Sequence, residues 1–501
     1  MPAFLLPHCL PLVAVRPQLP RLLEFLTEAQ VLSLHTSILR VLSEIGVRVD
    51  WRPALEVFAG HGCKVDFETR IVRIPEETMQ TALATCPHDF TLFGTDRKHD
   101  IQVTLEDIYT VAGSSALHVL DLDGQHRPAS LRDLADFTRL IDALPMADIM
   151  HAMVVPQDIR QEAFDRILFS TIMRYTTKHY YSQGQGGSSV DDQVQLASVV
   201  QGSREAVRAR PCFSFVICLN SPLVHSAERV QEMMECARHR IPVWLEATNM
   251  MGATAPISIA GALIEQTANV LAALTLMQLL NPGHPCIFSI ASGGFNLRSG
   301  TYVAASPEAV LLHCATAQMA RHYNLPFQGG SGLDSCLPDA QAGYERAMQA
   351  VPFSLAGVNF IHLAFGMMGQ LLTSSYEQAV IDNEIFAAVF RLAEGITVTP
   401  DTMAVENIRQ AGPGGQFLNQ KHTLLNYRQH QWQPQLTVRM GWDEFQRERG
   451  GKDMRQRARD LARQILKEHR PPPLSEAQVQ ELDRRAIEMQ NRAAARTYAK
   501  P

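Results

Sequence analysis

Between residues 109 and 392, short runs of β-forming residues alternate regularly with helical segments. Eight candidate strands each precede a candidate helix, and this eightfold alternation is the pattern of an α/β fold, the TIM (β/α)8 barrel. We therefore predict such a barrel over residues 106–395. The expected strands are Tyr109–Leu120, Asp148–Val154, His179–Gln183, Cys212–Leu219, Val243–Ala247, Cys286–Ile290, Pro326–Gly329 and Val358–Phe365. The expected helices are Leu131–Leu144, Glu162–Tyr175, Asp191–Gly202, Ala227–His239, Ile257–Leu280, Pro307–His322, Ala340–Val351 and Tyr376–Leu392.

An open, doubly wound sheet is the alternative α/β arrangement for the same alternation. Such a sheet usually carries a G-x-G-x-x-G turn after its first strand. The residues after Ala112 read Gly113-Ser-Ser-Ala-Leu-His118 and lack this turn. The sequence therefore favours the barrel.

Three further segments surround the predicted barrel. Residues 1–20 contain five prolines and no basic stretch before the apolar residues, which favours a surface extension over a signal peptide. Residues 21–105 predict a small α+β cap, whose first helix starts at a capping box of Thr27 and Gln30 and can end at Gly46. Residues 396–501 contain two charged amphipathic helices, 455–469 and 476–492, which we expect to pack on the barrel or on another subunit of a homo-oligomer.

Net charge, cysteine content and one long apolar run limit the partners and the location that we expect for this protein. A formal net charge of −6 gives no basic field for nucleic acid. Nine cysteines, an odd number without regular spacing, indicate reduced thiols and a cytoplasmic location. The apolar run Ile259–Leu280 is long enough to cross a membrane, but it contains Glu265, Gln266 and Asn269. Those polar groups favour a buried helix, so we expect no membrane partner.

In a TIM barrel the functional site lies where the strands end. Glycine-rich loops follow several predicted strands, at 184–187, 293–294 and 329–332, and such loops let backbone approach a ligand closely, although plain turns also use glycine. The strand ends offer these candidates: His118, Tyr180, Gln183, Asn220, Glu246, Asn249, Phe295, Asn296, Arg298, Gln328, Asp334, Cys336 and His362.

The sequence does not predict a metal centre. His61 and Cys63 are the only closely spaced histidine and cysteine pair suited to one site, and they lie in the predicted cap. No strand end supplies the three nitrogen or sulfur ligands of a catalytic zinc. A P-loop and a G-x-S-x-G nucleophile elbow are also missing, which removes the usual signatures of phosphoryl and acyl transfer.

Aromatic and methionine side chains are frequent around the predicted barrel. Each alone is more commonly barrel core, but together they could surround a quaternary ammonium group, which aromatic faces attract. Glu246 could supply the counter-charge, or it could be a structural partner of a neighbouring loop. Arg298 could form a fork on a substrate carboxylate, or an ion pair at the barrel rim. The side chains concerned are Phe213, Phe215, Trp244, Met250, Met251, Phe288, Phe295, Phe327, Phe365 and Met367.

A series of ordered motifs resembles the trimethylamine methyltransferase family, over nearly the whole chain from Glu28 to about residue 485. They are Gly252-Ala-Thr-Ala-Pro256, Leu297-Arg298-Ser-Gly300, Ser306-Pro-Glu308, Asp334-Ser335, Pro338-Asp-Ala-Gln-Ala-Gly-Tyr-Glu345, Tyr376-Glu-Gln378, Asp382-Asn-Glu384, Gly414-Gly-Gln-Phe417, Lys421-His-Thr423 and Trp432-Gln-Pro434. The resemblance implies a TIM-barrel methyltransferase that passes a methyl group from an amine to the cobalt of a separate corrinoid protein. It implies no cofactor bound tightly by this chain.

Family members that demethylate trimethylamine contain pyrrolysine in the stretch matching Asp334–Cys336. This sequence has standard residues there, like members that act on glycine betaine and other quaternary amines. A quaternary amine leaves as a neutral tertiary amine and needs no proton, so positioning and electrostatics suffice. Our hypothesis assigns Arg298 to the substrate carboxylate, Glu246 to the ammonium, and the Gln328–Cys336 loop with His362 to shaping the pocket.

The expected site therefore has two groups of residues. The catalytic candidates are Glu246, His362 and Cys336, where Cys336 is either a transient methyl acceptor or a small apolar residue. The substrate-binding candidates are Arg298, Asn296, Phe295, Gln328, Asp334, Asn220 and Tyr180. Two other functions stay open: a lyase or hydrolase that uses Glu246 and His362 as an acid/base pair, and a barrel that binds a methylamine without catalysis.

Overall fold

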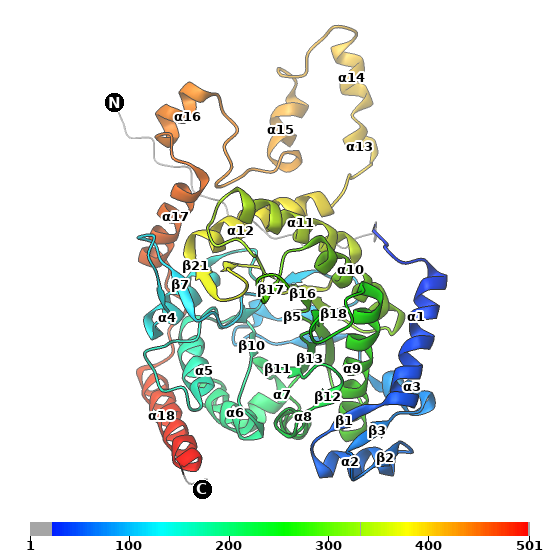
Figure 1. Cartoon of the computed structure of the whole chain (residues 1–501). Coiled ribbons are helices and arrows are strands. Elements are labelled where there is room, and N and C mark those ends of the chain that lie inside the picture. The colour runs from blue at the N-terminus through cyan, green and yellow to red at the C-terminus, as the bar shows by residue number, and fades with distance from the viewer. Residues whose placement is uncertain (1–22, 331, 499–501) are drawn as a thin grey trace.

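The computed structural model describes residues 23–330 and 332–498, and the extension predicted for residues 1–20 lies outside them. In the described chain, parallel strands form a single eight-stranded sheet at the centre of the molecule (Figure 1). Its strands are β6 (Tyr109–Thr110), β9 (Met150–His151), β10 (Tyr180–Ser182), β11 (Phe213–Leu219), β13 (Val243–Ala247), β15 (Cys286–Ile290), β18 (Phe327–Gly329) and β19 (Phe360–Ile361).

The sheet closes into a ring. Each strand pairs in parallel with the next in chain order, and β19 returns to pair with β6. A parallel bridge between Val111 and Ile149 joins the ends of β6 and β9. The predicted TIM barrel is confirmed, and the open-sheet alternative is wrong.

A helical layer surrounds the barrel. One helical connection follows each strand, in the predicted order, and the third connection is split into two helices. The helices are α4 (Leu131–Ala143), α5 (Phe164–Tyr175), α6 (Gly187–Gln201) with α7 (Arg204–Ala209), α8 (Ala227–His239), α9 (Ile259–Leu280), α10 (Pro307–His322), α11 (Ala340–Ala356) and α12 (Tyr376–Ala393). Helix α9 is the one described helix that is long and apolar enough to cross a membrane, but 78% of its apolar stretch is buried in the fold. It is a core helix, as its polar residues predict.

Three of the predicted strands are much shorter in the structure, and the run Asp148–Val154 forms a barrel strand only at Met150–His151. The run Tyr109–Leu120 divides into β6 and β7 (His118–Leu120), because the chain leaves the barrel near Gly113. A side chain at Gly113 would collide with Met367, so this close approach requires glycine. β7 joins a small second sheet in the order β20 (Met367–Met368), β21 (Thr373–Ser375), β7, β8 (His126–Pro128). The run Val358–Phe365 forms a barrel strand only at Phe360–Ile361.

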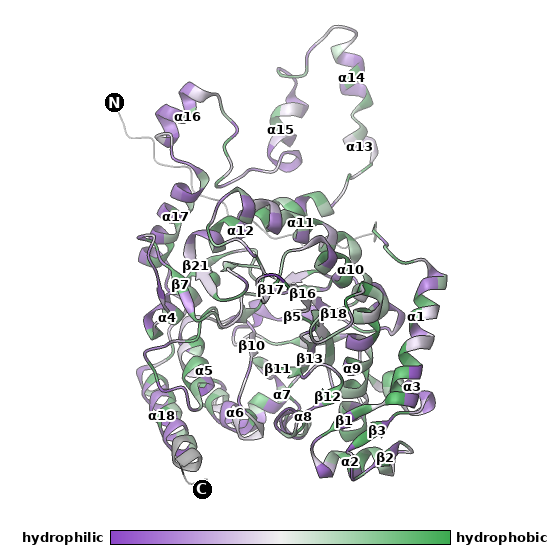
Figure 2. Ribbon diagram, in the orientation of Figure 1, coloured by the Kyte–Doolittle hydropathy of each residue, from purple (hydrophilic) through white to green (hydrophobic). Residues whose placement is uncertain are grey.

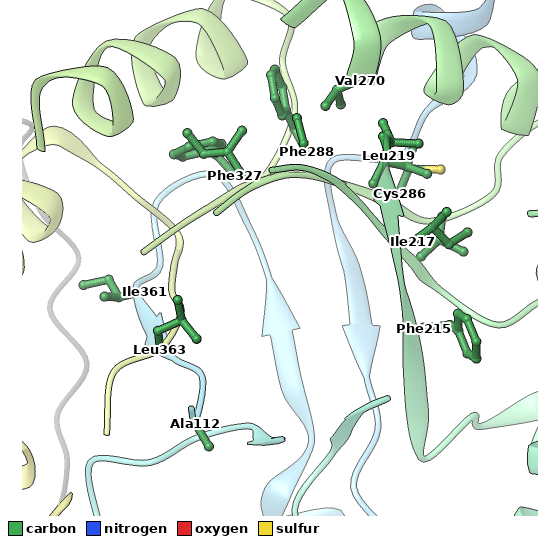
Figure 3. Packing of buried hydrophobic residues seen from close by; sticks show 14 of the residues in the cluster. Ala112, Phe215, Ile217, Leu219, Val270, Cys286, Phe288, Phe327, Ile361 and Leu363 are labelled. Atoms are coloured by element: carbon green, nitrogen blue, oxygen red, sulfur yellow. The ribbon is translucent and has the colours of Figure 1, made fainter. Parts of the chain in front are cut away.

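Alternation along the strands divides the barrel into an outer and an inner set of side chains. Figure 3 shows Phe215, Ile217 and Leu219 of β11, with Phe288 and Phe327, in the cluster that contains Val270 of α9. Val216, Trp244, Ile287 and Phe360 belong instead to a separate cluster inside the barrel. Along each strand, every second residue therefore packs on the helices, and the residues between them point into the barrel.

A hairpin closes the N-terminal end of the barrel. It consists of β4 (Phe90–Leu92) and β5 (Ile101–Val103), which pair in antiparallel fashion. Leu92, Ile101 and Val103 pack in the same inner cluster as Trp244 and Phe360. A ligand must therefore enter from the C-terminal end of the strands.

The N-terminal residues form the small α+β unit on one side of the barrel (Figure 1). The capping box of Thr27 and Gln30 starts α1, and Gly46 ends the π-helix that follows it, at φ +82°. Strand β1 pairs with β12 (Val224–His225) of the barrel domain, which ties the two parts together. The elements are α1 (Glu28–Arg40), the π-helix Val41–Ile45, β1 (Val47–Val49), α2 (Arg52–Gly60), β2 (Lys64–Asp66), β3 (Ile71–Arg73), α3 (Glu76–Thr85) and a 3-10 helix (Arg97–His99).

The C-terminal segment has two parts with different surroundings. Helix α17 (Met454–Glu468) packs on α12 and α4, and α18 (Glu476–Tyr498) packs on α5 and α6, so both predicted helices cover the barrel. The stretch between α12 and α17 instead carries helices that project away from the body (Figure 1). The stretch contains α13 (Pro400–Met403), α14 (Val405–Ala411), α15 (Lys421–His430) and α16 (Trp442–Arg449).

Candidate active site

The inner face carries a polar layer near the C-terminal ends of the strands. Cys218 of β11 lies beside Glu246 of β13, Glu246 beside Ser289 of β15, and Ser289 beside Gln328 of β18, since these residues are in register. Below this row, the register places Val216, Trp244 and Ile287 in an apolar layer. The barrel thus changes from an apolar floor to a polar upper wall within one step of the strand alternation.

Glu246 is the centre of this layer. Its Oε2 accepts hydrogen bonds from Gln328 Nε2 at 2.8 Å, Ser289 Oγ at 3.1 Å and Tyr181 Oη at 3.2 Å. The Cys218 thiol lies 3.6 Å from the other carboxylate oxygen. Several donors therefore converge on one buried carboxylate.

This carboxylate is stabilised by neutral donors alone. Burial raises the pKa of Glu246, while the hydrogen bonds lower it in part. Among the described residues, its one basic neighbour within ion-pair distance is His362, at 3.7 Å. Burial and the nearby His151 hold the pKa of His362 well below its usual value, so this ring is neutral. The site consequently holds a buried carboxyl group that has no cationic partner among the described residues.

Two buried polar atoms next to Glu246 lack a hydrogen-bond partner among the described residues. They are Nε2 of His362 and Oε1 of Gln328, and both side chains are almost completely buried. On the other edge of the His362 ring, Nδ1 lies 3.2 Å from Gln328 Nε2. Because buried polar groups normally find a partner, two such atoms in one place indicate a site for a polar ligand.

Solvent reaches this layer at Cys218. Cys218 is exposed, whereas every other residue of β11 is buried. Burial of the surrounding wall and the charge of Glu246 raise the pKa of the Cys218 thiol, which keeps it protonated at neutral pH. A small molecule can therefore reach the inner wall at Cys218, whose thiol is a weak hydrogen-bond donor next to the Glu246 carboxylate.

Aromatic rings complete the wall on one side. Tyr181 packs edge-on against Trp244 with ring centroids 4.8 Å apart, and it lies 5.0 Å from His362 and 4.7 Å from His151. Burial lowers the pKa of His151 to about 4, so this ring is neutral as well. Tyr181 thereby joins the apolar layer to the carboxylate, because its ring packs on Trp244 and its hydroxyl donates to Glu246.

The structure brings together three of the residues predicted from strand ends: Glu246, Gln328 and His362. It does not bring Tyr180 to them, because Tyr180 points outward and packs on Phe169 at 5.5 Å. The contributions of Tyr181, Cys218, Ser289 and His151 were missed by the sequence analysis. Strand alternation could have indicated them once Glu246 was placed on the inner face.

The aromatic cage expected from the sequence is wrong for five of its ten members. Phe213, Phe215, Phe288, Phe327 and Phe365 lie in the outer cluster between the strands and the helices. The reason is the alternation of the strands, which points these rings away from the barrel axis. Of the phenylalanine and tryptophan residues expected in the cage, Trp244 is the one that the described chain places in the inner cluster.

Several other predicted residues lie on loops at the barrel mouth. Phe295 and Asn296 end β16 (Gly293–Asn296), which pairs with β14 (Met250–Met251) and forms a hairpin with β17 (Thr301–Val303). Arg298 lies exposed in the tip of this hairpin. Asn220 is also exposed, and its carbonyl accepts a hydrogen bond from Asn269. These residues are at the rim and do not touch Glu246.

Asp334 and Cys336 lie on the loop after β18. The carboxylate of Asp334 accepts backbone hydrogen bonds from Ala304 at 2.8 Å and Ala305 at 3.0 Å, which fastens this loop to the start of α10. Cys336 is exposed, and its thiol lies 4.0 Å from the Asp334 carbonyl. Among the described residues, no group of three histidine, cysteine, aspartate or glutamate side chains is arranged to hold a metal ion.

Comparison with known proteins assigns the chain to a family. A family model described as trimethylamine methyltransferase matches residues 12–493. A glycine betaine methyltransferase of Desulfitobacterium hafniense strain Y51 is 33% identical over 90% of this chain and 93% of its own length. A trimethylamine methyltransferase of Desulfitobacterium hafniense strain DSM 10664 / DCB-2 is 32% identical over 90% of each chain. The crystal structure of Methanosarcina barkeri monomethylamine methyltransferase covers 87% of this chain and 91% of its own, with 12% identity and a TM-score of 0.46. The chain belongs to the trimethylamine methyltransferase family.

Proposed function

We propose that this protein transfers a methyl group from a betaine-like quaternary amine to the cobalt of a corrinoid carried by a separate protein. The observation that carries the proposal is the buried Glu246 carboxylate, which has neutral donors but no cationic partner among the described residues. A buried charge without a counter-ion is costly. A substrate with a permanent positive charge would supply that counter-ion.

The surroundings of Glu246 suit an ammonium group that cannot donate hydrogen bonds. A quaternary nitrogen is attracted by negative charge, which the ionised Glu246 carboxylate would supply beside Tyr181. Solvent reaches the wall only at a few positions such as Cys218, so attraction in this site is less screened than in water. The unpartnered Nε2 of His362 and Oε1 of Gln328 are available to a second polar group of the substrate or to water.

The neutral state of His362 fits the departure of a tertiary amine. When the N–CH3 bond of a quaternary amine breaks, the electron pair stays on nitrogen and the product is neutral, so no proton must be delivered. A reduced corrinoid would supply the nucleophile that accepts the methyl group. The role of this chain is then to hold the methyl carbon toward the open C-terminal end of the barrel, which the β4–β5 hairpin leaves as the way in.

The relatives support an amine as the methyl donor. One relative is named a glycine betaine methyltransferase and another a trimethylamine methyltransferase. The stretch Asp334–Cys336 consists of standard amino acids, which favours a quaternary substrate over trimethylamine. The eight cysteines that the structure describes are all free, in keeping with the cytoplasm as the proposed location.

The test is a methyl-transfer screen. The protein is mixed with a reduced corrinoid, and glycine betaine, carnitine, proline betaine, choline and trimethylamine are added in turn while the corrinoid absorbance is followed. Turnover with one or more quaternary amines, and slower turnover with trimethylamine, is the expected result. Binding of an amine by calorimetry without any transfer would favour a binding protein, and turnover of a substrate without the corrinoid would favour a lyase or hydrolase.

A further inference from the structure

His313 is a buried histidine to which the proposed transfer gives no role. It lies on α10, which packs on β16 and β18. Figure 2 shows hydrophobic residues along much of this helix. The imidazole is completely buried and packs on the ring of Phe353 with centroids 5.4 Å apart. A polar ring in such surroundings requires hydrogen-bond partners for its nitrogens.

Both ring nitrogens of His313 have backbone partners. Nε2 lies 2.8 Å from the carbonyl oxygen of Ser292, and Nδ1 lies 3.0 Å from the backbone nitrogen of Gly330. A carbonyl only accepts a hydrogen bond and a backbone N–H only donates one, so the proton is on Nε2 and Nδ1 is the acceptor. Burial lowers the pKa of His313 to about 4, which keeps this neutral form. The ring therefore joins two backbone positions in one fixed orientation.

The two backbone positions follow strands of the candidate site. Ser292 comes shortly after Ser289 of β15, and Gly330 comes shortly after Gln328 of β18. Both Ser289 and Gln328 donate hydrogen bonds to the carboxylate at the centre of the site. His313 thus ties together the chain after two neighbouring strands whose side chains bind this carboxylate.

Ser292 extends these connections to a third strand. Its hydroxyl accepts a hydrogen bond from the backbone of Asn249 at 3.0 Å and donates one to the carbonyl of Ala247 at 3.3 Å. Ala247 directly follows Glu246 on β13. The chain after Glu246 is therefore fastened to the same residue that His313 holds.

Gly330 connects His313 to His362. A Cβ atom at Gly330 would collide with the carbonyl oxygen of His362, so the two main chains are in direct contact. The backbone amide of His362 also donates to the carbonyl of Gly329 at 3.0 Å. A Cβ atom at Gly329 would lie 2.8 Å from Nδ1 of His313, so this close approach requires glycine as well. A shift of Gly330 would consequently shift His362.

We propose that His313 is a positioning residue for the proposed methyl transfer. It holds Gly330, and Gly330 in turn places His362 in the wall of the site. The inference rests on the proposed function, which assigns the task of holding the substrate to this wall. Nδ1 of His362 lies 3.2 Å from Nε2 of Gln328, so displacement of His362 also disturbs a donor to the central carboxylate. A disturbed wall would hold the methyl carbon less accurately, and the rate of transfer depends steeply on that position.

Two substitutions separate the two hydrogen bonds of the ring. His313→Asn keeps an acceptor near the Nδ1 position for Gly330, whereas His313→Gln keeps a donor near the Nε2 position for Ser292. We expect His313→Gln to lower kcat/KM for a quaternary amine about 10-fold and His313→Asn to stay within about threefold of wild type. Both should lower Tm by a few degrees, because each loses one buried hydrogen bond. Equal losses of kcat/KM, or a larger loss in His313→Asn, would overturn the proposal.

His284 is a matched control with the same bonding pattern. Its Nε2 lies 2.9 Å from the carbonyl of Ile241, and its Nδ1 lies 3.2 Å from the side-chain nitrogen of Asn281. It is buried just before β15, at the opposite end of the strand from the site. His284→Asn and His284→Gln should lower Tm by a similar amount and leave kcat/KM unchanged. If they lower kcat/KM as much as His313→Gln does, the effect belongs to stability and the proposal fails.

Crystal structures of wild type and both His313 variants test the positioning without turnover. The distance between Nδ1 of His362 and Nε2 of Gln328, 3.2 Å in wild type, should increase in His313→Gln and be kept in His313→Asn. This result does not depend on the substrate, so it separates failure of the positioning from failure of the proposed function. An unchanged His362 in His313→Gln would overturn the proposal.

Gly330→Ala tests the second step independently of His313. The added methyl group should displace His362 and lower kcat/KM by roughly 100-fold. Gly343→Ala on α11 is the control, because its Cβ atom would meet no atom of the described chain within 4 Å, and it should leave kcat/KM unchanged. Full activity of Gly330→Ala would show that the contact between Gly330 and His362 does not position the site, and the proposal would be wrong.

Discussion

The side-chain amide of Gln328 lies 2.8 Å from Oε2 of Glu246 on the inner barrel wall, although Ser289 of β15 stands between their two strands. The same nitrogen reaches Nδ1 of His362 at 3.2 Å. One neutral amide therefore joins the charged centre of the site to its neutral imidazole. We therefore expect substitutions that remove the Glu246 carboxylate and substitutions that remove its hydrogen-bond donors to change activity by different amounts.

Replacing Glu246 by Gln should remove binding of the cation while keeping the shape of the wall. We expect kcat/KM for a quaternary amine to fall by roughly 10²- to 10³-fold, since a charge in a poorly solvated site contributes several kcal/mol. The free energy of unfolding should stay the same or rise by about 1 kcal/mol, because an uncompensated buried charge is removed. Glu228→Gln, on the surface of α8, is the control. Full activity of Glu246→Gln would contradict the proposed site.

The pH dependence of substrate binding should follow Glu246 alone. Burial raises the pKa of its carboxyl above the usual value of about 4.3. Only the ionised form attracts a cation, so KM should rise as the pH falls through this raised pKa and level off above it. His362 is neutral on both sides of that range, because burial holds its pKa well below the usual value. A lyase or hydrolase using His362 as a base would instead show a second, histidine-dependent limb.

Steady-state measurements between about pH 5 and about pH 9 check this expectation. For wild type, KM should rise at acid pH. For Glu246→Gln, the residual activity should show no such dependence on acid pH. A corrinoid-only control at each pH separates the behaviour of the methyl acceptor from that of the protein. A bell-shaped profile of kcat would favour acid/base chemistry over the proposed transfer.

The sequence predicts the barrel and the centre of the site. It does not predict which side chains point into the barrel and which point toward the helices. Eightfold alternation identifies the fold, and strand ends identify Glu246, Gln328 and His362. Tyr180 and Tyr181 are adjacent on a strand buried on both faces, so hydrophobicity does not reveal which one points inward. The same ambiguity misplaced Phe215 and Phe288. The exposure of α13, α14 and α15 depends on where the chain leaves α12, which local sequence does not encode.

The two adjacent tyrosines provide a matched pair of substitutions. Tyr181→Phe removes the hydroxyl that donates to Glu246 at 3.2 Å and should lower kcat/KM about 10-fold, the effect expected for a hydrogen bond to a charged group. Tyr180→Phe lies on the opposite face against Phe169 and should leave kcat/KM unchanged, with less than about 1 kcal/mol lost in stability. Kinetics and thermal unfolding of both variants are measured together. A larger loss of kcat/KM in Tyr180→Phe than in Tyr181→Phe would contradict the proposed site, because it would locate the site on the outer face of β10.

Arg298 is expected to discriminate between substrates through a carboxylate. It lies exposed in the tip of the β16–β17 hairpin, at the mouth above the polar layer. If the hairpin closes on a bound betaine, Arg298→Ala should raise KM for glycine betaine by about 10-fold or more and leave choline almost unchanged. Competition assays with both amines measure this difference. Equal losses for the two substrates would contradict a carboxylate contact.

The two exposed cysteines in the described chain should respond differently to substrate. Cys218 contacts Glu246 inside the barrel, whereas Cys336 lies on the loop after β18. The packed barrel wall around Cys218 and the neighbouring Glu246 raise the pKa of its thiol, so a thiol-specific reagent should modify it slowly at about pH 8. Bound betaine should protect Cys218 from modification and leave Cys336 reactive, which peptide mass spectrometry measures for each site. Cys336→Ala should retain full turnover, whereas Cys218→Leu should block it by filling the space beside the carboxylate. Loss of activity in Cys336→Ala, together with protection of Cys336, would instead assign that thiol a role in methyl transfer.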